Sequence, residues 1–583
     1  MKSRLFKSII IFTLSIFVFY KSNAQSPKWL WVRSMSGGSR ILSIIVDPIN
    51  SDNYTSGYLS GTVDFDPGPD SFNIISPGPV SMFVSKLDSS GKFIWAKAIG
   101  GIGAVVGINE IAIDKSTGDI YNTGSFSGTI DFDPGSSIFN LSSDDRSYSA
   151  FITKLDRYGN FIWAKVLKGA DGITGRAIAI DPEFGDIYIG GDFSGIIDFD
   201  PGPNKFNLTS VKWKDIFISK FNSKGNFIWA KTIGVSATIY SIGIDPAGNV
   251  VTTGNFYGVA DFDPNNGVFN LACVGSTDVF ISKLDSGGNF VWAKSMEGTK
   301  NTNIGSSSMA IDRRSGDVYI TGYFLGTVDF DPGASMFNLT TIGTINTFIS
   351  KLDSAGNFVW AKAMGGSGGG YGYSVELDSK ENGNVYLSGS FSGTIDFDSG
   401  SGIYYLSSSG ENDAFLSKLD RSGNFVWAQT MGGEFSDVAF SVAIDAFDRV
   451  YLAGRFYSSS IFFDSTELMN LNSTDSTDST SSIFIAKLDS DLQTSVNNFK
   501  QHQVNLYPNP ASDKLSIEFN DDKAFDLGIN MFNIVGDLVF TSSDKNIAHE
   551  KTIDISALPN AIYFIELNIN GNRIMKKIVK QGR

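Results

Sequence analysis

Short runs of alternating apolar and polar residues cover most of the chain, and tight-turn residues separate them. Between residues 373 and 429 the pattern predicts strands at 373–378, 385–389, 414–419 and 425–429, joined by turns such as Gly383-Asn384. Alternation with a period of two places one set of side chains on each face of a sheet, and Gly-Asn pairs suit tight hairpins. Because this four-strand pattern recurs along the chain, the sequence predicts an all-β protein.

A repeated phrase, Phe-(Ile/Val)-Trp-Ala, gives the length of the repeat. A degenerate copy contains Trp31, and six later copies contain Trp95, Trp163, Trp229, Trp292, Trp360 and Trp427, with a mean period of 66 residues. A second phrase, Lys-Leu-Asp, precedes each later Trp, although Asn222 once replaces its Asp. The first Trp lacks a preceding Lys-Leu-Asp, and the last Lys-Leu-Asp, which ends at Asp489, lacks a following Trp.

This offset predicts a closed ring of repeats. The strand of Trp31 would complete the unit formed by residues 439–490 and would cover an otherwise open strand edge. Counting closed units gives a seven-bladed β-propeller over residues 25–490. The alternative, an open solenoid, would need complete units and polar caps at both ends. We expect the repeated Trp to pack between blades rather than to bind a ligand.

The repeat text, with Ser-Lys-Leu-Asp, Gly-Asn-Phe-Val-Trp-Ala, Val-Ala-Ile-Asp and Val-Tyr-Leu-Ala-Gly in succession, resembles the SBBP-type β-propeller repeat over about residues 29–490. The resemblance implies the fold and little about function, because propellers have many unrelated functions. Each unit is also longer than the roughly 40–50 residues of a four-strand blade. The excess follows the second strand of each unit.

The two ends of the chain carry targeting signals. Residues 1–24 read as a secretory signal peptide, with basic residues before an apolar stretch and Ser22-Asn23-Ala24 as the cleavage site; an N-terminal membrane anchor is the alternative. The C-terminal part contains Tyr507-Pro508-Asn509-Pro510-Ala511-Ser512-Asp513 and alternating strands that predict a small Ig-like β-sandwich.

Residues 503–583 closely resemble the type A C-terminal sorting domain of the type IX secretion system. The resemblance implies Sec export, passage across an outer membrane through the type IX machinery, and release or attachment at the cell surface. An ordinary Ig-like accessory domain is the alternative. Residues 491–502 read as the linker to this domain. In the mature chain no further segment is apolar enough to predict a transmembrane segment.

Pairs of carboxylates recur in the extra residues of each unit. Six Asp-Phe-Asp phrases place Asp residues two apart, so both carboxylates point to one face while Phe points inward; the pairs are Asp64 and Asp66, Asp131 and Asp133, Asp198 and Asp200, Asp261 and Asp263, Asp329 and Asp331, and Asp396 and Asp398. In the seventh unit the phrase is Phe462-Phe463-Asp464. Convergent carboxylates suggest Ca²⁺ as a cofactor. The alternative, which we favour, is that Asp-Pro-Gly only builds and caps a turn.

Composition narrows the possible chemistry. The chain has one cysteine, Cys273, and two histidines, His502 and His549, both outside the predicted propeller, which removes a Ser-His-Asp triad and His-ligated zinc from that domain. The net charge of −15 concentrates in residues 25–502, which carry −18, so nucleic acid is not an expected partner. Unit-specific deviations, at Lys212, Lys214 and Asp215, at Arg313-Arg314, and at Arg455, form no recognisable constellation.

We therefore expect a secreted or surface-displayed propeller that acts as a binding or adhesion module, without enzymatic activity, for an extracellular protein or glycan. Loops on one face of the disc would contact the target. A secreted carbohydrate-active enzyme that uses Asp carboxylates is the first alternative, and an acid pair confined to one central cleft would support it. A structural surface-layer component is the second alternative.

Overall fold

A computed structural model of the protein describes residues 27–143, 147–169, 171–211, 213–234, 236–300, 302–379, 383–463, 466–469, 481–489, 504–519, 525–533, 538–547, 549–569 and 572–581. The chain divides into two compact units, Met1–Asp491 and Leu492–Arg583. The expected signal peptide (1–24) and linker (491–502) lie outside the described residues. Every described element is a strand, so this part of the chain contains no apolar helix of membrane-crossing length.

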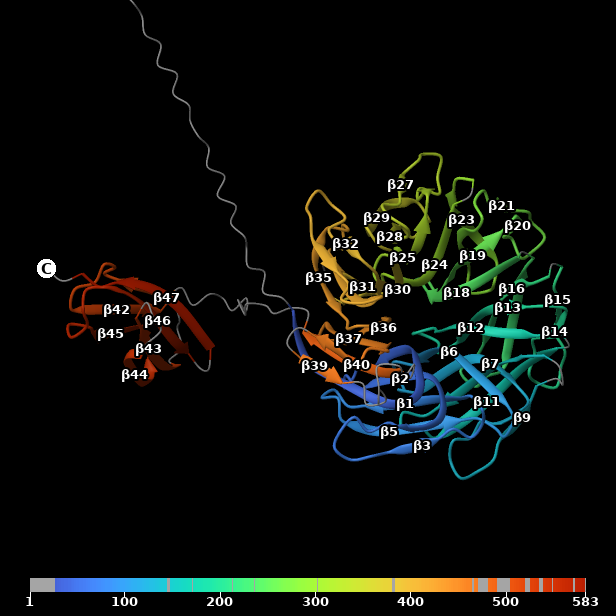
Figure 1. The fold of residues 1–583 in the computed structure, drawn as a ribbon, viewed down its shortest axis with the longest axis horizontal. Coiled ribbons are helices and arrows are strands. Elements are labelled where there is room, and N and C mark those ends of the chain that lie inside the picture. Colours follow the sequence, from blue (N-terminus) through green and yellow to red (C-terminus); the bar gives the residue numbers. More distant parts are fainter. Residues whose placement is uncertain are drawn as a thin grey trace, which may run out of the picture. The chain divides into compact units, whose positions relative to one another are not determined.

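In the described part of the N-terminal unit, each of the seven repeats forms a four-stranded antiparallel sheet (Figure 1). The first strands are β1 (Lys28–Val46), β6 (Val105–Ile113), β12 (Ile173–Ile180), β18 (Ser236–Ile244), β24 (Asn303–Ile311), β30 (Gly370–Leu377) and β36 (Asp437–Ile444). The second strands are β2 (Asn53–Asp64), β7 (Ile120–Ser127), β13 (Ile187–Phe193), β19 (Val250–Tyr257), β25 (Val318–Leu325), β31 (Val385–Phe391) and β37 (Arg449–Phe456).

The outer two strands of each sheet complete the repeat. The third strands are β4 (Ser81–Leu87), β10 (Ser149–Leu155), β16 (Asp215–Phe221), β22 (Asp278–Leu284), β28 (Asn346–Leu352), β34 (Asp413–Leu419) and β40 (Ser482–Asp489). The fourth strands of the first six sheets are β5 (Phe93–Ile99), β11 (Phe161–Gly169), β17 (Phe227–Ile233), β23 (Phe290–Gly298), β29 (Phe358–Gly366) and β35 (Phe425–Met431).

The Lys-Leu-Asp phrase forms the turn between the third and fourth strands. In the first repeat the Asp88 carboxylate accepts hydrogen bonds from the backbone N–H groups of Ser90 and Lys92, at 2.8 and 2.9 Å. Gly91 in this turn has a φ of +78°, a conformation that disfavours a Cβ, and its backbone packs on the Trp31 ring. The equivalent glycines each pack on the Trp of the preceding repeat, as predicted for Trp between repeats; these are Gly159, Gly225, Gly288, Gly356 and Gly423.

Apolar side chains fill the space between neighbouring sheets. One cluster joins Tyr386 and Leu416 of the sixth repeat to Leu452 and Phe484 of the seventh, and six comparable clusters of described residues lie at the other interfaces between repeats. The first strands contact one another in chain order, and β36 contacts β1. The repeats therefore pack side by side, and the seventh packs against the first.

Strand β1 belongs to two sheets. Residues Lys28–Met35 pair with β40 and form the fourth strand of the seventh sheet, whereas Ser36–Val46 pairs with β2 and forms the first strand of the first sheet. In this register Trp31 lies opposite Lys487. This is the pairing that the offset between the two repeated phrases predicts.

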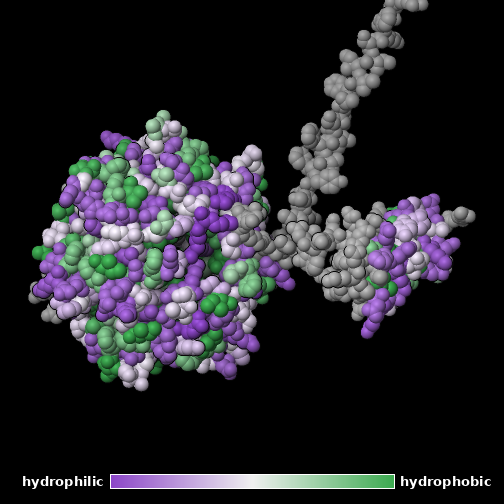
Figure 2. Space-filling view, turned by 180° about the vertical axis from the view of Figure 1, so that it is seen from behind, coloured by the Kyte–Doolittle hydropathy of each residue, from purple (hydrophilic) through white to green (hydrophobic). Residues whose placement is uncertain are grey.

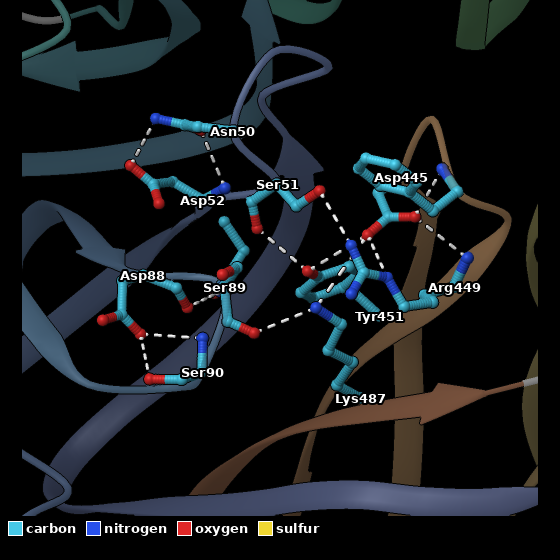
Figure 3. Close-up of polar contacts among 12 residues, drawn as sticks. Asn50, Ser51, Asp52, Asp88, Ser89, Ser90, Asp445, Arg449, Tyr451 and Lys487 are labelled. Carbon is cyan, nitrogen blue, oxygen red and sulfur yellow. Dashed lines mark hydrogen bonds and ion pairs between the residues drawn. The ribbon is translucent and has the colours of Figure 1, made fainter. Parts of the chain in front are cut away.

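Side chains also join the seventh repeat to the first (Figure 3). The Lys487 ammonium donates to the Ser89 carbonyl at 2.9 Å, and the Tyr451 hydroxyl donates to the Ser51 carbonyl at 2.9 Å. Both bonds connect residues from opposite ends of the repeat region, so polar contacts reinforce the pairing of β1 with β40.

The extra residues of each repeat form a short hairpin between the second and third strands. Its strands are the end of β2 with β3 (Asn73–Ile75), then β8 (Thr129–Asp131) with β9 (Asn140–Ser142), β14 (Ile196–Asp198) with β15 (Asn207–Thr209), β20 (Val259–Asp261) with β21 (Asn270–Ala272), β26 (Thr327–Asp329) with β27 (Asn338–Thr340), β32 (Thr394–Asp396) with β33 (Tyr405–Ser407), and β38 (Ser460–Phe463) with β39 (Thr466–Met469). In three repeats the hairpin also pairs with the fourth strand of the preceding repeat. The Asp-Phe-Asp phrase begins at the last residue of the first strand of this hairpin and continues into the loop that joins its two strands.

The C-terminal unit contains two antiparallel sheets, with strand orders β41-β42-β45 and β44-β43-β46-β47. The strands are β41 (Val504–Tyr507), β42 (Lys514–Phe519), β43 (Phe525–Phe532), β44 (Leu538–Ile547), β45 (Glu550–Asp554), β46 (Ile562–Ile569) and β47 (Asn572–Val579). Both sheets contribute to one apolar core, for example through Ile517, Ile529 and Ile565.

Candidate functional site

On the face of the N-terminal unit drawn in Figure 2, hydrophilic and hydrophobic residues are interspersed, so surface hydropathy does not mark a binding site there. Comparison of the repeats with one another is more informative. Each first strand contains a β-bulge at the same place. The residue at this bulge differs in nearly every repeat: Leu42, Asn109, Arg176, Tyr240, Ser307, Tyr373 and Phe440.

A second variable position lies on each second strand, directly after its glycine. It holds Tyr58, Ser125, Asp192, Asn255, Tyr323, Ser390 and Arg455. The register places this residue opposite the residue two before the bulge, as Arg455 lies opposite Val438 in the seventh repeat. Both variable positions therefore lie toward the beginning of the first strands.

Aromatic and arginine side chains gather at this end in what we call the aromatic–arginine cluster: Arg40, Tyr58, Tyr323, Tyr371, Tyr373, Phe440, Arg455 and Tyr457. The Phe440 ring is at its centre, with the guanidinium of Arg40 at 4.7 Å, that of Arg455 at 5.4 Å and the Tyr373 ring at 5.5 Å. The rings continue from Tyr373 to Tyr371 at 6.3 Å, in a stacked pair, and from Tyr371 to Tyr323 at 5.2 Å.

Neither arginine of the cluster forms an ion pair with a described carboxylate. Arg40 donates to the Tyr58 hydroxyl at 3.0 Å, but the Nε atoms of Arg40 and Arg455 are buried and have no hydrogen-bond partner among the described residues. Burial and the neighbouring charge of Arg40 lower the pKa of Arg455. The cluster therefore combines flat aromatic faces with two positive groups that lack a counter-ion, and it suits a ligand that has apolar faces and negative charge.

Further along the first strands, residues from all seven repeats line a central cavity of about 290 Å³. Most of the residues that line it are apolar, with small residues such as Ala112, Ala179 and Gly243 at one level. Beyond it, where the first strands end, lies a second cavity of about 300 Å³ that shares Lys115, Arg313 and Glu376 with the first. We call this second space the charged cavity.

The charges of this cavity influence one another. Burial raises the pKa of the Glu376 carboxyl, and the cations Lys115 and Arg313 partly oppose this effect. Burial and Arg313 lower the pKa of the Lys115 ammonium. The cavity therefore places Lys115 and Arg313 close enough to act on the Glu376 carboxyl, and Arg314, Asp312, Asp378 and Asp445 line the same space.

The repeated Asp pairs form hydrogen bonds within their own hairpins. The Asp64 carboxylate accepts from the backbone N–H groups of Asp66 at 3.1 Å and Phe72 at 2.8 Å, and the Asp66 carboxylate accepts from that of Gly68 at 2.8 Å. Equivalent bonds of 2.7–3.1 Å occur at Asp131 and Asp133, Asp198 and Asp200, Asp261 and Asp263, Asp329 and Asp331, and Asp396 and Asp398. The intervening Phe is buried in each of these six repeats, whereas Asp464 of the seventh lies outside the described residues.

Two carboxylates are only part of a calcium site, since Ca²⁺ takes six to eight oxygen ligands. Among the described residues no group of three His, Cys, Asp or Glu side chains is arranged to hold a metal ion. A cation at an Asp pair would therefore need backbone oxygens or water for most of its ligands.

The structure separates the unit-specific residues that the sequence singled out. Lys214 and Arg176 both form ion pairs with Asp192, the first at 2.7 Å, and Asp215 accepts from the backbone N–H of Val211 at 2.7 Å. Arg455 belongs to the aromatic–arginine cluster, and Arg313 with Arg314 lines the charged cavity. Lys212 lies outside the described residues.

Sequence reasoning missed most of the two candidate sites. It passed over Arg40, Tyr373 and Phe440 in the cluster and Lys115 and Glu376 in the charged cavity. A signal was present when the repeats are aligned on the Asp that follows each first strand: the cluster positions vary strongly, Glu376 replaces a small residue, and Lys115 replaces a proline that three other repeats have. The bulge hid it, because a bulge changes which side chains share a face.

The acids that line the charged cavity are of two kinds. Among the described residues that line it, Glu376 is a unit-specific acid, whereas Asp312, Asp378 and Asp445 are copies of an Asp present in all seven repeats. These three copies already have partners: Asp312 accepts from Arg421 at 2.8 Å, Asp378 from Asn384 at 2.6 Å and Asp445 from Arg449 at 2.9 Å.

Residues 505–581 match the family model described as a secretion system C-terminal sorting domain. This match confirms the sorting domain predicted at the C-terminus, and it indicates export through the type IX secretion system to the cell surface or beyond.

Two curated proteins resemble the chain. An uncharacterized WD repeat-containing protein, L264, of Acanthamoeba polyphaga mimivirus is 26% identical over 466 residues, which cover 68% of this chain and 33% of that protein. The regulatory protein FlaEY of Caulobacter vibrioides is 26% identical over 169 residues, which cover 29% of this chain and 17% of that protein. The chain thus spans about a third of the first relative and about a sixth of the second, and the first agrees with a repeated β-structure.

Among solved structures, dimeric latent PorU from Porphyromonas gingivalis is 10% identical and covers 60% of this chain and 34% of its own. The TM-score of 0.12 is too low for this likeness to support a conclusion about the fold.

Proposed function

We propose that this protein is an exported seven-bladed β-propeller that binds an extracellular glycan at the aromatic–arginine cluster and uses its C-terminal Ig-like domain, residues 503–583, as a sorting signal. The propeller would comprise residues 25–490, behind a signal peptide at 1–24 and before a linker at 491–502. Binding or adhesion, rather than catalysis, would be its task.

One observation carries the proposal: the residues that differ between the repeats meet at one end of the first strands and form a continuous aromatic surface. Repetition preserves residues that every repeat needs for folding, so an unrepeated cluster of Phe440, Tyr373 and two arginines needs a separate explanation. Sugar rings have flat faces of C–H groups that pack on aromatic rings, and polar groups then fix their orientation. The unpaired guanidinium groups of Arg40 and Arg455 favour a glycan that carries carboxylate or sulfate groups.

Binding to a glycan array that includes acidic and neutral polysaccharides, such as polygalacturonate and β-glucan, tests the proposal. We expect acidic glycans to bind, and the substitutions Phe440→Ala and Arg455→Ala to weaken binding at least tenfold. Trp213→Ala is the matched control, because Trp213 is 84% exposed and lies outside the cluster. Equal binding by the cluster variants and the control would show that the glycan does not bind at the cluster. If no glycan on the array binds and an extracellular protein does, the proposal that the ligand is a glycan is wrong.

For the Asp-Phe-Asp phrases we propose the turn-forming role, supported by the repeated hydrogen bonds from backbone amides. Calcium binding by the same residues is the second possibility, and the effect of EDTA on the thermal transition of the unmodified protein distinguishes the two.

A further inference from the structure

The charged cavity lies at the opposite end of the first strands from the aromatic–arginine cluster. Within the described residues it is lined by the ends of β24, β30 and β36 together with Lys115, which follows β6. Its volume of about 300 Å³ is at the lower limit of small-molecule pockets. A ligand the size of a monosaccharide fits this space.

Three side chains in this cavity break the repeat. Glu376 occupies a position that holds Ala or Gly in five other repeats and Ile45 in the first; the five are Ala112, Ala179, Gly243, Ala310 and Ala443. Lys115 and Arg313 occupy a position that holds proline in three other repeats, at Pro48, Pro182 and Pro246. Substitutions in the second, fifth and sixth repeats therefore bring three charges to one place.

These charges are not used by the fold. None of Lys115, Arg313 and Glu376 is in ion-pair contact with another described side chain, although both cations act on the pKa of Glu376. The repeated acids nearby, Asp312 and Asp378, have partners in Arg421 and Asn384. The repeats that carry Ala and Pro at these positions build the same sheets, so the charges serve some purpose other than packing.

We propose that the charged cavity binds a small hydroxylated carboxylate, such as a monomeric sugar acid. The ligand carboxylate would lie between Lys115 and Arg313, whose donors suit it, and a ligand hydroxyl would donate to the Glu376 carboxylate. Of the other acids in the lining, Asp312 and Asp445 already accept from Arg421 and Arg449, and Arg314 adds a third cation, so the site favours an anion over a neutral sugar. This site is separate from the aromatic–arginine cluster, so the proposal for the charged cavity and the proposal for the cluster are independent.

Titration calorimetry of the purified protein with D-glucuronate tests the proposal, with D-glucose and acetate as comparison ligands. We expect glucuronate to bind at least tenfold more tightly than glucose or acetate. Arg313→Ala and Lys115→Ala should each weaken glucuronate binding at least tenfold. Glu376→Ala should remove the preference for glucuronate over acetate, and because it introduces the residue of other repeats it should leave the thermal transition unchanged.

The matched control is Trp213→Ala, which should bind glucuronate as the unmodified protein does, because Trp213 is 84% exposed and lies outside both the charged cavity and the aromatic–arginine cluster. No binding of glucuronate, glucose binding as well as glucuronate, or cavity variants that bind glucuronate normally would each overturn the proposal. Loss of glucuronate binding in Phe440→Ala alone would also overturn it, because the ligand would then lie at the cluster.

Discussion

Glu110 offers a test of the contacts between neighbouring first strands. Directly after the bulge, five repeats have serine: Ser43, Ser241, Ser308, Ser374 and Ser441. The side chains of Ser308, Ser374 and Ser441 accept a backbone N–H from the next repeat at 3.2–3.3 Å. In the second repeat Glu110 takes this role and accepts from the N–H of Ile178 at 2.7 Å.

The Glu110 carboxyl has a raised pKa, which links its ionisation to stability. Burial raises this pKa from 4.5 to about 8, although the hydrogen bond from Ile178 opposes the shift. Between these two values the folded carboxyl keeps its proton and the unfolded one loses it, so stability falls as pH rises from 4.5 to about 8. The full shift corresponds to at most about 5 kcal/mol. Because the side chain is partly exposed to solvent, we expect a loss of about 1–3 kcal/mol.

Glu110→Gln removes the ionisation and keeps a carbonyl that accepts from Ile178. The variant should equal the unmodified protein near pH 4.5 and exceed its free energy of unfolding by about 1–3 kcal/mol at pH 8. Denaturant unfolding followed by tryptophan fluorescence measures this, since all nine tryptophans lie between residues 29 and 427 and report only on the N-terminal unit. A matched control, Ser374→Ala, loses an acceptor without a titratable group and should cost about 1 kcal/mol at every pH. A stability difference between Glu110→Gln and the unmodified protein that stays constant from pH 5 to pH 8.5 would refute the reasoning.

Three further predictions concern the turns and the closing strand. Asp396→Ala should destabilise the N-terminal unit by about 1–3 kcal/mol, because two backbone N–H groups lose their acceptor, whereas Asp396→Asn should destabilise it less. If EDTA lowers the thermal transition of the unmodified protein, the Asp pairs bind calcium instead. Gly356→Ala should lower the free energy of unfolding by about 1–2 kcal/mol, because the φ of Gly356 is +79° and the new Cβ would lie 3.2 Å from the Trp292 ring. Gly107→Ala is the control, because Gly107 has more room for a Cβ. Equal melting temperatures of the two variants would contradict this account. Deletion of residues 25–35 should abolish the cooperative fluorescence transition, and a peptide of residues 27–35 added in trans should restore it; an unchanged transition after deletion would show that the β1–β40 pairing is dispensable.

The repeated features of the fold were predictable because each strand pattern occurs in several repeats, so a copy that is ambiguous by itself can be assigned from the others. The sequence placed the sixth-repeat strands at 373–378, 385–389, 414–419 and 425–429, and β30, β31, β34 and β35 are found there with ends that differ by up to three residues. The pairing of the Trp31 strand followed from the offset of two phrases. By contrast, the two candidate sites consist of residues that occur once.

A unique residue such as Glu376 has no periodic signal, and its significance depends on which other unique residues lie near it. Lys115 is far away in the sequence and meets it only because the first strands of all repeats end on the same side. The sequence pattern placed Tyr373 in a strand, but alternation of apolar and polar residues could not locate the bulge at this residue. The sequence therefore predicted the scaffold well and the sites poorly.

Because β1 belongs to two sheets, its pairing with β40 also depends on the order in which the chain is synthesised. Synthesis runs from the N-terminus, so Lys28 is made among the first residues of the repeat region and its partner, Asp489, among the last. Until β40 is made, the Lys28–Met35 part of β1 has no partner strand, and an unpaired edge invites association with other chains. The matched sorting domain begins at residue 505, just after β40. Only a chain that already contains β40 can therefore carry the matched sorting domain, so a prematurely terminated chain lacks the sorting signal.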